Sequence, residues 1–92
     1  MVQFKLSPDA DTNFTSLQAS VELLHPETMR RKFGPCHRES CEEDKGYRDG
    51  EWFFTDEDDN VYTVYFRWGV GRIGAMPENR GRANELIAFL RG

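Results

Sequence analysis

The sequence predicts an α+β domain, in which an antiparallel sheet of three to four strands carries helices packed mainly on one face. The first observation is a pair of aromatic segments, residues 51–55 and 61–68, separated by five polar residues. Aromatic and β-branched residues favour strands, and a short polar break between two such segments is typical of a β-hairpin. The second observation is that apolar residues recur at helical spacing before this hairpin and again near the C-terminal end.

Length and composition indicate a single soluble domain over residues 1–92. The chain is 38% hydrophobic and 30% charged, and no apolar run approaches the roughly 20 residues needed to span a bilayer. The N-terminal residues lack the basic start and apolar core of a signal peptide, so we expect a cytoplasmic protein. Two cysteines give no disulfide framework, and we expect reduced thiols.

The first strand is predicted over residues 2–6, where Val2, Phe4 and Leu6 alternate with polar residues and indicate one buried face. A helix is predicted next, over residues 14–24. Its apolar residues recur at intervals of three, four and three, and are Phe14, Leu17, Val21 and Leu24. We expect these four side chains to belong to the core.

A second, short helix is predicted to begin at Pro26, because proline suits the first helical position, with His25 as its N-cap. Met29 and Phe33 lie four residues apart on it, and the Gly-Pro pair that follows ends it. Residues 35–50 show no periodicity and much charge, so we expect them to form a long loop.

The hairpin strands carry large apolar side chains on both faces, as central strands of a sheet do. Residues 70–74, which glycines flank, are predicted to return as a third strand. The final helix is predicted to start at Pro77 and to end before Gly92. Its apolar stripe consists of Ala83, Leu86, Ile87 and Leu90.

The residues suited to metal binding or catalysis are Cys36, His37, Cys41 and His25. A structural zinc site usually has paired knuckles of ligands, whereas here a single C-x4-C segment carries an adjacent histidine. Cys36 and His37 are neighbours whose side chains diverge, which also argues against a Cys-His catalytic pair. We therefore expect no metal, no other cofactor and no enzymatic activity. A small nuclease or toxin-like enzyme that uses His25 or His37 is kept as an alternative.

Acidic residues dominate the middle of the chain. Residues 39–59 contain ten of them against Lys45 and Arg48, which gives this stretch a net charge of −8. The predicted protein-binding residues are Glu42, Glu43 and Asp44 in the long loop and Asp56, Glu57, Asp58 and Asp59 at the hairpin turn. An Asp- and Asn-rich turn explains the second group structurally, whereas an acidic tip for a basic partner is the functional interpretation. A calcium loop is excluded, because Val61 and Arg67 stand where glycine and glutamate are required.

Basic residues concentrate in two other parts of the chain, residues 30–38 and 66–92. The predicted nucleic-acid-binding residues are Arg67, Arg72, Arg80 and Arg82, together with Arg30, Arg31 and Lys32. Arginines contact phosphates while neighbouring aromatic residues, here Tyr62, Tyr65 or Trp68, stack on bases. The net charge of −4 opposes this interpretation, because phosphate contacts dominate such affinities.

Three segments together resemble a pattern in small phage-encoded proteins. They are FGPC at 33–36, EWFFTDEDDNVYTVY at 51–65 and GRIG at 71–74, with a terminal helix after them. The pattern in that group has an F-G-P element, a W-x-F-x-D-E-x-G-x-V-x-T-x-Y hairpin and a short glycine-flanked strand. Asp59 or Asn60 stands where the turn glycine is expected. The shared residues are structural rather than catalytic.

The resemblance implies a class of partner. Small acidic α+β proteins of this kind include anti-CRISPR proteins and other host-takeover inhibitors, as well as many of no known role. We therefore expect a non-enzymatic, phage-encoded inhibitor in the host cytoplasm. It would bind a host protein or nucleoprotein complex that has a basic nucleic-acid-binding surface. The alternative binding class is a small RNA-binding module that contacts RNA directly through arginine and aromatic residues. No membrane partner is expected.

Overall fold

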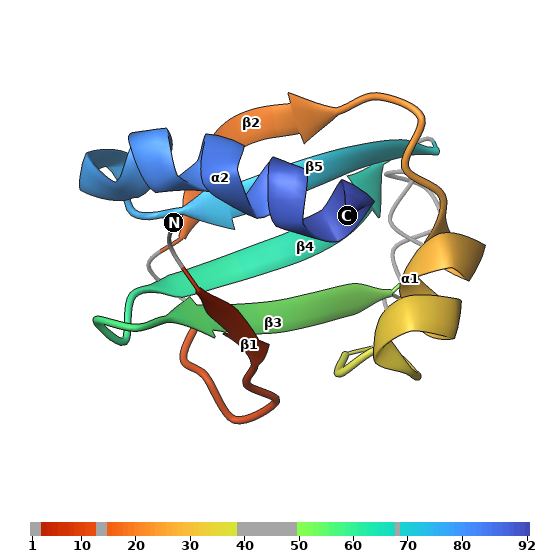
Figure 1. Ribbon diagram of the computed structural model, residues 1–92, viewed down its shortest axis with the longest axis horizontal. Helices are drawn as coiled ribbons and strands as arrows, with labels where there is room; N and C mark the ends of the chain where they lie inside the picture. Colours follow the sequence, from red (N-terminus) through yellow and green to blue (C-terminus); the bar gives the residue numbers. More distant parts are fainter. Residues whose placement is uncertain (1–2, 13–14, 39–49, 68) are drawn as a thin grey trace.

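The computed structural model describes residues 3–12, 15–38, 50–67 and 69–92. Its centre is an antiparallel sheet with the strand order β1-β3-β4-β5-β2, and the described residues contribute five strands to it (Figure 1). Along the chain the elements are β1 (Phe4–Leu6), β2 (Ser16–Val21), α1 (Pro26–Phe33), β3 (Glu51–Asp56), β4 (Val61–Arg67), β5 (Val70–Ala75), the short 3₁₀ helix η2 (Pro77–Asn79) and α2 (Arg80–Arg91). The predicted α+β class and antiparallel sheet are confirmed, with five strands in place of the expected three to four.

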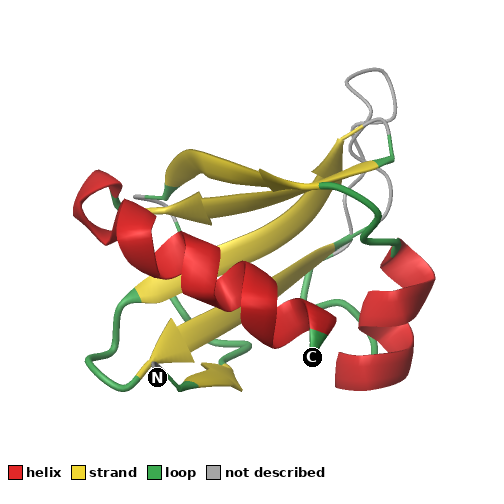
Figure 2. Ribbon diagram, turned by 45° about the horizontal axis from the view of Figure 1, so that its top comes forward, coloured by secondary structure: helices red, strands yellow, loops and turns green. Residues whose placement is uncertain are grey.

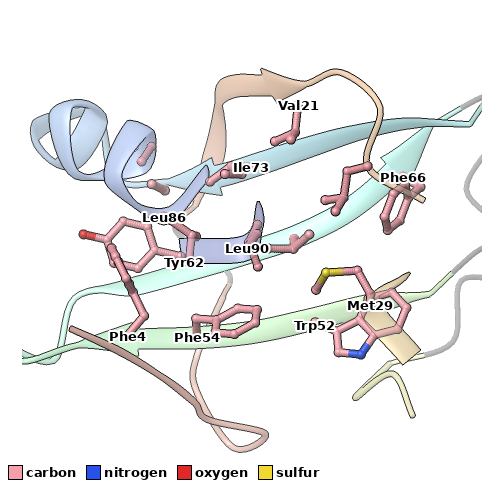
Figure 3. Close-up of a cluster of buried hydrophobic side chains, with 14 residues drawn as sticks. Phe4, Val21, Met29, Trp52, Phe54, Tyr62, Phe66, Ile73, Leu86 and Leu90 are labelled. Atoms are coloured by element: carbon pink, nitrogen blue, oxygen red, sulfur yellow. The ribbon is translucent and has the colours of Figure 1, made fainter. Parts of the chain in front are cut away.

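Both α-helices contribute to one core on one face of the sheet, as predicted. Helix α2 crosses this face, and α1 lies at one end of it (Figure 2). Fully buried side chains come from Ala83, Leu86 and Leu90 of α2 and from Met29 of α1. Figure 3 shows how these side chains meet the sheet. The buried residues that they meet there are Phe4, Val21, Trp52, Phe54, Tyr62, Val64, Phe66, Ile73 and Ala75.

The hairpin strands follow the predicted alternation. Trp52 and Phe54 of β3 lie opposite Val64 and Tyr62 of β4 in the ladder, and all four are fully buried. The indole N–H of Trp52 donates to the carbonyl of Gly34, 3.0 Å away, just past α1. This hydrogen bond fastens the end of α1 to β3.

The predicted helix over residues 14–24 is wrong, because this stretch contains strand β2. Of its four predicted core residues, Val21 and Leu24 are buried, Leu17 is 47% exposed and Phe14 lies outside the described residues. A β-bulge shifts the register of β2, so that Leu17 and Val21 lie on opposite faces of the sheet. The helical spacing is therefore a coincidence. The stretch becomes a strand because β5 offers it an edge to pair with, and local spacing cannot show that.

A glycine in β5 makes room for this edge strand. A Cβ atom on Gly71 would lie 3.1 Å from the carbonyl oxygen of Val21 and 3.3 Å from the side chain of Leu24. Any larger residue at that position would push β2 and the residues after it away from β5. Gly71 therefore serves close approach between neighbouring backbones.

The opposite face of the sheet is covered by no helix of the described residues, and we call it the helix-free face. It carries Phe53, Thr55, Thr63, Tyr65, Arg67 and Arg72. Ser7, just after β1, and Thr15, just before β2, contact this face. Ser7 Oγ lies 2.6 Å from Thr55 Oγ1, and Thr15 Oγ1 lies 3.4 Å from Thr63 Oγ1. These contacts bury the two threonines of the sheet.

Candidate functional site

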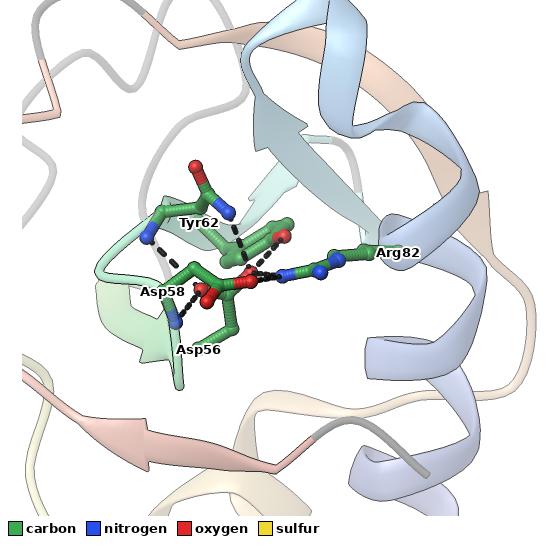
Figure 4. A network of polar contacts seen from close by, with 5 residues as sticks. Asp56, Asp58, Tyr62 and Arg82 are labelled. Carbon is green, nitrogen blue, oxygen red and sulfur yellow. Dashed lines mark hydrogen bonds and ion pairs between the residues drawn. The ribbon is translucent and has the colours of Figure 1, made fainter.

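The best-organised polar site lies where β3 meets the hairpin turn (Figure 4). Its centre is the carboxylate of Asp56, whose side chain is fully buried. The backbone N–H groups of Asp58 and Asn60 donate to Oδ1 at 2.9 and 3.0 Å. Asn60 Nδ2, the Tyr62 hydroxyl and Arg82 Nη1 donate to Oδ2 at 2.9, 2.8 and 2.8 Å. We call these five residues the Asp56 network.

Strand alternation explains why this carboxylate points inward. Asp56 follows Trp52 and Phe54 at intervals of two, so its side chain lies on the core face of β3. Helix α2 crosses that face, and Arg82, near its N-terminal end, reaches the carboxylate. Tyr62 lies on the same face, opposite Phe54. A buried carboxylate requires hydrogen-bond donors, and here the turn, β4 and α2 supply them.

The Asp56 network sets the charge states of its members. Burial would raise the pKa of Asp56, but hydrogen bonds from Asn60, Arg82 and Tyr62 outweigh it and hold that pKa well below the usual range of a carboxyl group. Burial and the hydrogen bond to Asp56 raise the pKa of Tyr62. Hydrogen bonds to Asp56 and Asp58 raise the pKa of Arg82. At neutral pH the site therefore holds a carboxylate, a neutral phenol and a guanidinium.

This arrangement is structural rather than catalytic. The Asp56 carboxylate accepts five hydrogen bonds, and its lowered pKa makes it a weak base. The proton of Tyr62 is directed toward Asp56 and is held there. What the network does is fix the hairpin turn from the inside and fasten the beginning of α2 to it.

The hairpin tip, residues 56–60, presents the other predicted acids. Glu57, Asp58 and Asp59 are exposed. Asp58 also forms a 2.8 Å ion pair with Arg82, although its side chain remains 61% exposed. Asp59 adopts a φ of 63, in the left-handed region that aspartate tolerates in turns. The prediction of Asp56 as a protein-binding residue of the acidic tip is therefore wrong, because its side chain is buried and faces the core.

The predicted basic residues are divided among several parts of the molecule. Arg82 belongs to the Asp56 network. Lys32 Nζ donates to the carbonyls of Leu90 and Gly92 at 2.8 and 2.9 Å, and so caps the C-terminal end of α2. The exposed ones on helices are Arg30 and Arg31 of α1 and Arg80 of α2. The predicted loop acids Glu42, Glu43 and Asp44 lie outside the described residues.

Arg67 and Arg72 lie together on the helix-free face, on the adjacent strands β4 and β5. Tyr65 of β4 and Ser20 of β2 flank Arg72 in the ladder. The Nε atom of Arg72 is buried and finds no hydrogen-bond acceptor in the described part of the chain. A buried guanidinium N–H favours an anionic acceptor. We call Tyr65, Arg67 and Arg72 the arginine face.

Phe53, also on the helix-free face, is covered by the chain that follows α1. The Arg38 guanidinium lies 5.2 Å from the centroid of its ring and 3.5 Å from the carboxylate of Glu51. The backbone N–H of Phe53 donates to His37 Nδ1 at 2.9 Å. Burial lowers the pKa of His37, which favours the neutral imidazole that this hydrogen bond needs.

The residues suited to metal binding serve the fold where the structure describes them. Cys36 packs half-buried against the core, His37 holds the backbone of β3, and His25 is the exposed N-cap of α1. Cys41 lies outside the described residues. Within the described ranges, no three His, Cys, Asp or Glu side chains form a group that could hold a metal ion. That the protein needs no metal stays a prediction.

Comparison with protein-family models, with curated proteins and with solved structures gives no match to this chain. No helix in the described residues is long and apolar enough to cross a membrane.

The Asp56 network is not predicted from the sequence. Part of the signal is local, because Asp56 continues the alternation of Trp52 and Phe54 and so places an acid on a buried face. Its partner Arg82 follows 26 residues later on a helix, and no spacing rule connects the two. An acid at a position that alternation assigns to the core is the signal to look for.

Proposed function

We propose that this chain is a phage-encoded, non-enzymatic inhibitor of the anti-CRISPR kind, which binds a host nucleic-acid-handling protein or nucleoprotein complex in the host cytoplasm through its hairpin tip. One observation carries the proposal. The Asp56 network fixes the turn from inside, while Glu57, Asp58 and Asp59 remain exposed on it. A surface that is ordered before binding loses less conformational entropy when it binds.

The charge of the hairpin tip favours a basic partner. Arg82 neutralises part of the charge of Asp58, whereas Glu57 and Asp59 form no ion pair within the described residues. A groove that normally holds phosphates would accept such carboxylates. Attraction between the tip and that groove would also raise the association rate at low salt.

The polar groups that could do chemistry support binding over catalysis. The lone pairs of Asp56 are taken by five donors, and Nδ1 of His37 is taken by a backbone N–H. A neutral His37 then carries its proton on Nε2, so neither residue has the free acceptor of a general base. A nuclease or toxin-like enzyme has no observation in its favour within the described residues.

Removal of charge from the tip tests the proposal. Glu57→Gln/Asp59→Asn keeps both side-chain shapes and leaves the Asp56 network intact. It should slow association with the partner and flatten the salt dependence of the rate. The matched control, Glu22→Gln/Glu27→Gln, removes the same charge from exposed positions elsewhere and should have a smaller effect.

The partner for this measurement is captured from a nuclease-treated bacterial lysate, purified, and immobilised for surface plasmon resonance across a salt series. An equal effect of the two double variants would mean that overall charge, not the tip, governs binding. Unchanged association of the tip variant would reject the tip as the contact.

A second candidate function, a small RNA-binding module, is favoured by the arginine face. Arg67 and Arg72 lie on the adjacent strands β4 and β5, and Tyr65 supplies an aromatic ring opposite Arg72. Arg72→Gln should then weaken the binding of single-stranded RNA. The salt dependence of the affinity should fall by the amount that corresponds to about one phosphate contact. Glu57→Gln/Asp59→Asn should tighten RNA binding, which is opposite in sign to its effect on a basic protein partner.

A further inference from the structure

Strand β2 forms one edge of the sheet and pairs, among the described residues, with β5 alone (Figure 1). Edge strands accept further strands through their outer N–H and C=O groups. Proteins normally protect such edges with charged residues, prolines or very short strands. β2 has six residues, Ser16–Val21, and none of them is charged or proline. This edge therefore lacks these three forms of protection.

The opposite edge is protected. Strand β1 has three residues and carries Lys5 at its centre. β2 has one protective device, the bulge between Leu17 and Ala19, which leaves residues 19–21 as its regular segment. The β1 edge is thus protected by its short length and its charge. We call the β2 edge, which only the bulge protects, the open edge.

We propose that the open β2 edge binds a second copy of this chain, with the two β2 strands antiparallel and Ser20 on the symmetry axis. Opposite residues in such a pair point to the same side of the joined sheet. Ala19 and Val21 point toward the core face, and Ser20 points toward the helix-free face. Ala19 of one copy then lies opposite Val21 of the other, and Ser20 lies opposite Ser20.

The absence of charge on β2 is the reason for proposing a second copy of this chain as the partner that pairs with the β2 edge. A symmetric antiparallel pair places each strand opposite itself, so a charged central residue would face its own charge. Lys5 therefore disfavours such a pair at β1. β2 is neutral throughout, and Glu22, the first charged residue after it, lies outside the regular segment.

Exposed apolar residues support the antiparallel direction. Leu17 and Leu23 are 47% and 90% exposed, and they flank the regular segment on its two sides. Leu23 also adopts a φ of 63, which is strained for a leucine. In an antiparallel pair, Leu17 of one copy lies at the same end as Leu23 of the other. Their contact would remove exposed apolar surface from water.

This self-association should be weak and should strengthen with salt. One short strand gives a small interface, so we expect a dissociation constant on the order of micromolar or higher. Each copy has a net charge of −4, and salt screens the repulsion between them. Binding through the hairpin tip weakens with salt instead, so the two proposals can fail separately.

Sedimentation velocity on the full chain over a concentration series tests the proposal. Ser20→Lys and Ser20→Glu each place like charges on the symmetry axis, and each alone should stay monomeric. An equimolar mixture of the two should form a heterodimer several-fold tighter than the wild-type dimer, because lysine then faces glutamate. Gln3→Lys, at an exposed position beside β1, is the matched control and should leave self-association unchanged.

Arg72 lies beside position 20 within each sheet, so Ser20→Glu gains an opposite charge there and Ser20→Lys a like charge. Circular dichroism checks that each variant is folded, and Ser20→Glu alone keeps the test decisive if Ser20→Lys is unstable. A wild-type chain that stays monomeric at the highest concentration would overturn the proposal. Single variants that associate as the wild type does would overturn it as well.

Discussion

Arg82 Nη1 lies 2.8 Å from Asp56 Oδ2, and this ion pair joins the beginning of α2 to the start of the hairpin tip. The side chain of Asp56 is fully buried, whereas that of Arg82 is 34% exposed. The Asp56 carboxylate therefore depends on hydrogen-bond donors from the protein, whereas water can replace part of the hydrogen bonding of the Arg82 guanidinium. Removal of the two partners should have unequal consequences.

Asp56→Ala should lower the free energy of unfolding by about 3–5 kcal/mol, because it leaves the buried Tyr62 hydroxyl and the turn N–H groups without their acceptor. Arg82→Ala should cost less than Asp56→Ala, since four hydrogen bonds to the carboxylate remain and water can replace part of what Arg82 gains. Urea unfolding at neutral pH measures both. Glu57→Ala, at an exposed tip position outside the Asp56 network, is the control and should stay within about 0.5 kcal/mol of wild type. Wild-type stability in Asp56→Ala would show that the network is not a stabilising one.

Acid should destabilise the protein through Asp56. Its pKa in the folded protein lies below the value of about 4 in the unfolded chain. The ionised carboxylate therefore contributes its full stability above about pH 4, and this contribution is lost as the pH falls toward the folded pKa. Wild type and Asp56→Asn should differ most in unfolding free energy at neutral pH and converge in strong acid. A difference that stays constant throughout an acid titration would contradict the assigned charge state.

Protonation of His37 should destabilise the protein at a higher pH than protonation of Asp56 does. Burial places its folded pKa below the ordinary value of 6.5, so the unfolded chain takes up the proton first. The stability of the neutral form is present above about pH 6.5 and is lost as the pH falls through the folded pKa. The reason is that Nδ1 can no longer accept the N–H of Phe53. NMR titration of the His37 ring measures the folded pKa, and a value at or above 6.5 would contradict this prediction.

Two leucine substitutions test strand β2 against the helix that the spacing suggests. Leu24→Ala should cost about 2–5 kcal/mol, because Leu24 is 4% exposed within the core. Leu17→Ala should cost less than about 1 kcal/mol, because Leu17 is 47% exposed on an edge strand. Thermal unfolding measures both. Large losses for both variants would indicate a buried helical face and would refute the strand.

The sequence by itself determined the elements whose signals are local. Pro26 begins α1 and Gly34 ends it, with a φ of 84 that glycine adopts without strain. Alternating aromatic residues made the hairpin strands recognisable, and the spacing of Ala83 and Leu86 did the same for α2. Capping, side-chain periodicity and turn chemistry act within a few residues, so a linear sequence displays them.

Tertiary structure alone decided the edge strand and the polar site. Residues 16–21 became a strand because β5 had an unpaired edge and Gly71 allowed a close approach. Asp56 became the centre of a network because α2 crosses the sheet and brings Arg82 over it. In both cases the stabilising partner is distant in the chain. The energy of strand pairing and of a buried ion pair depends on which segments meet in space, and local sequence patterns do not record that.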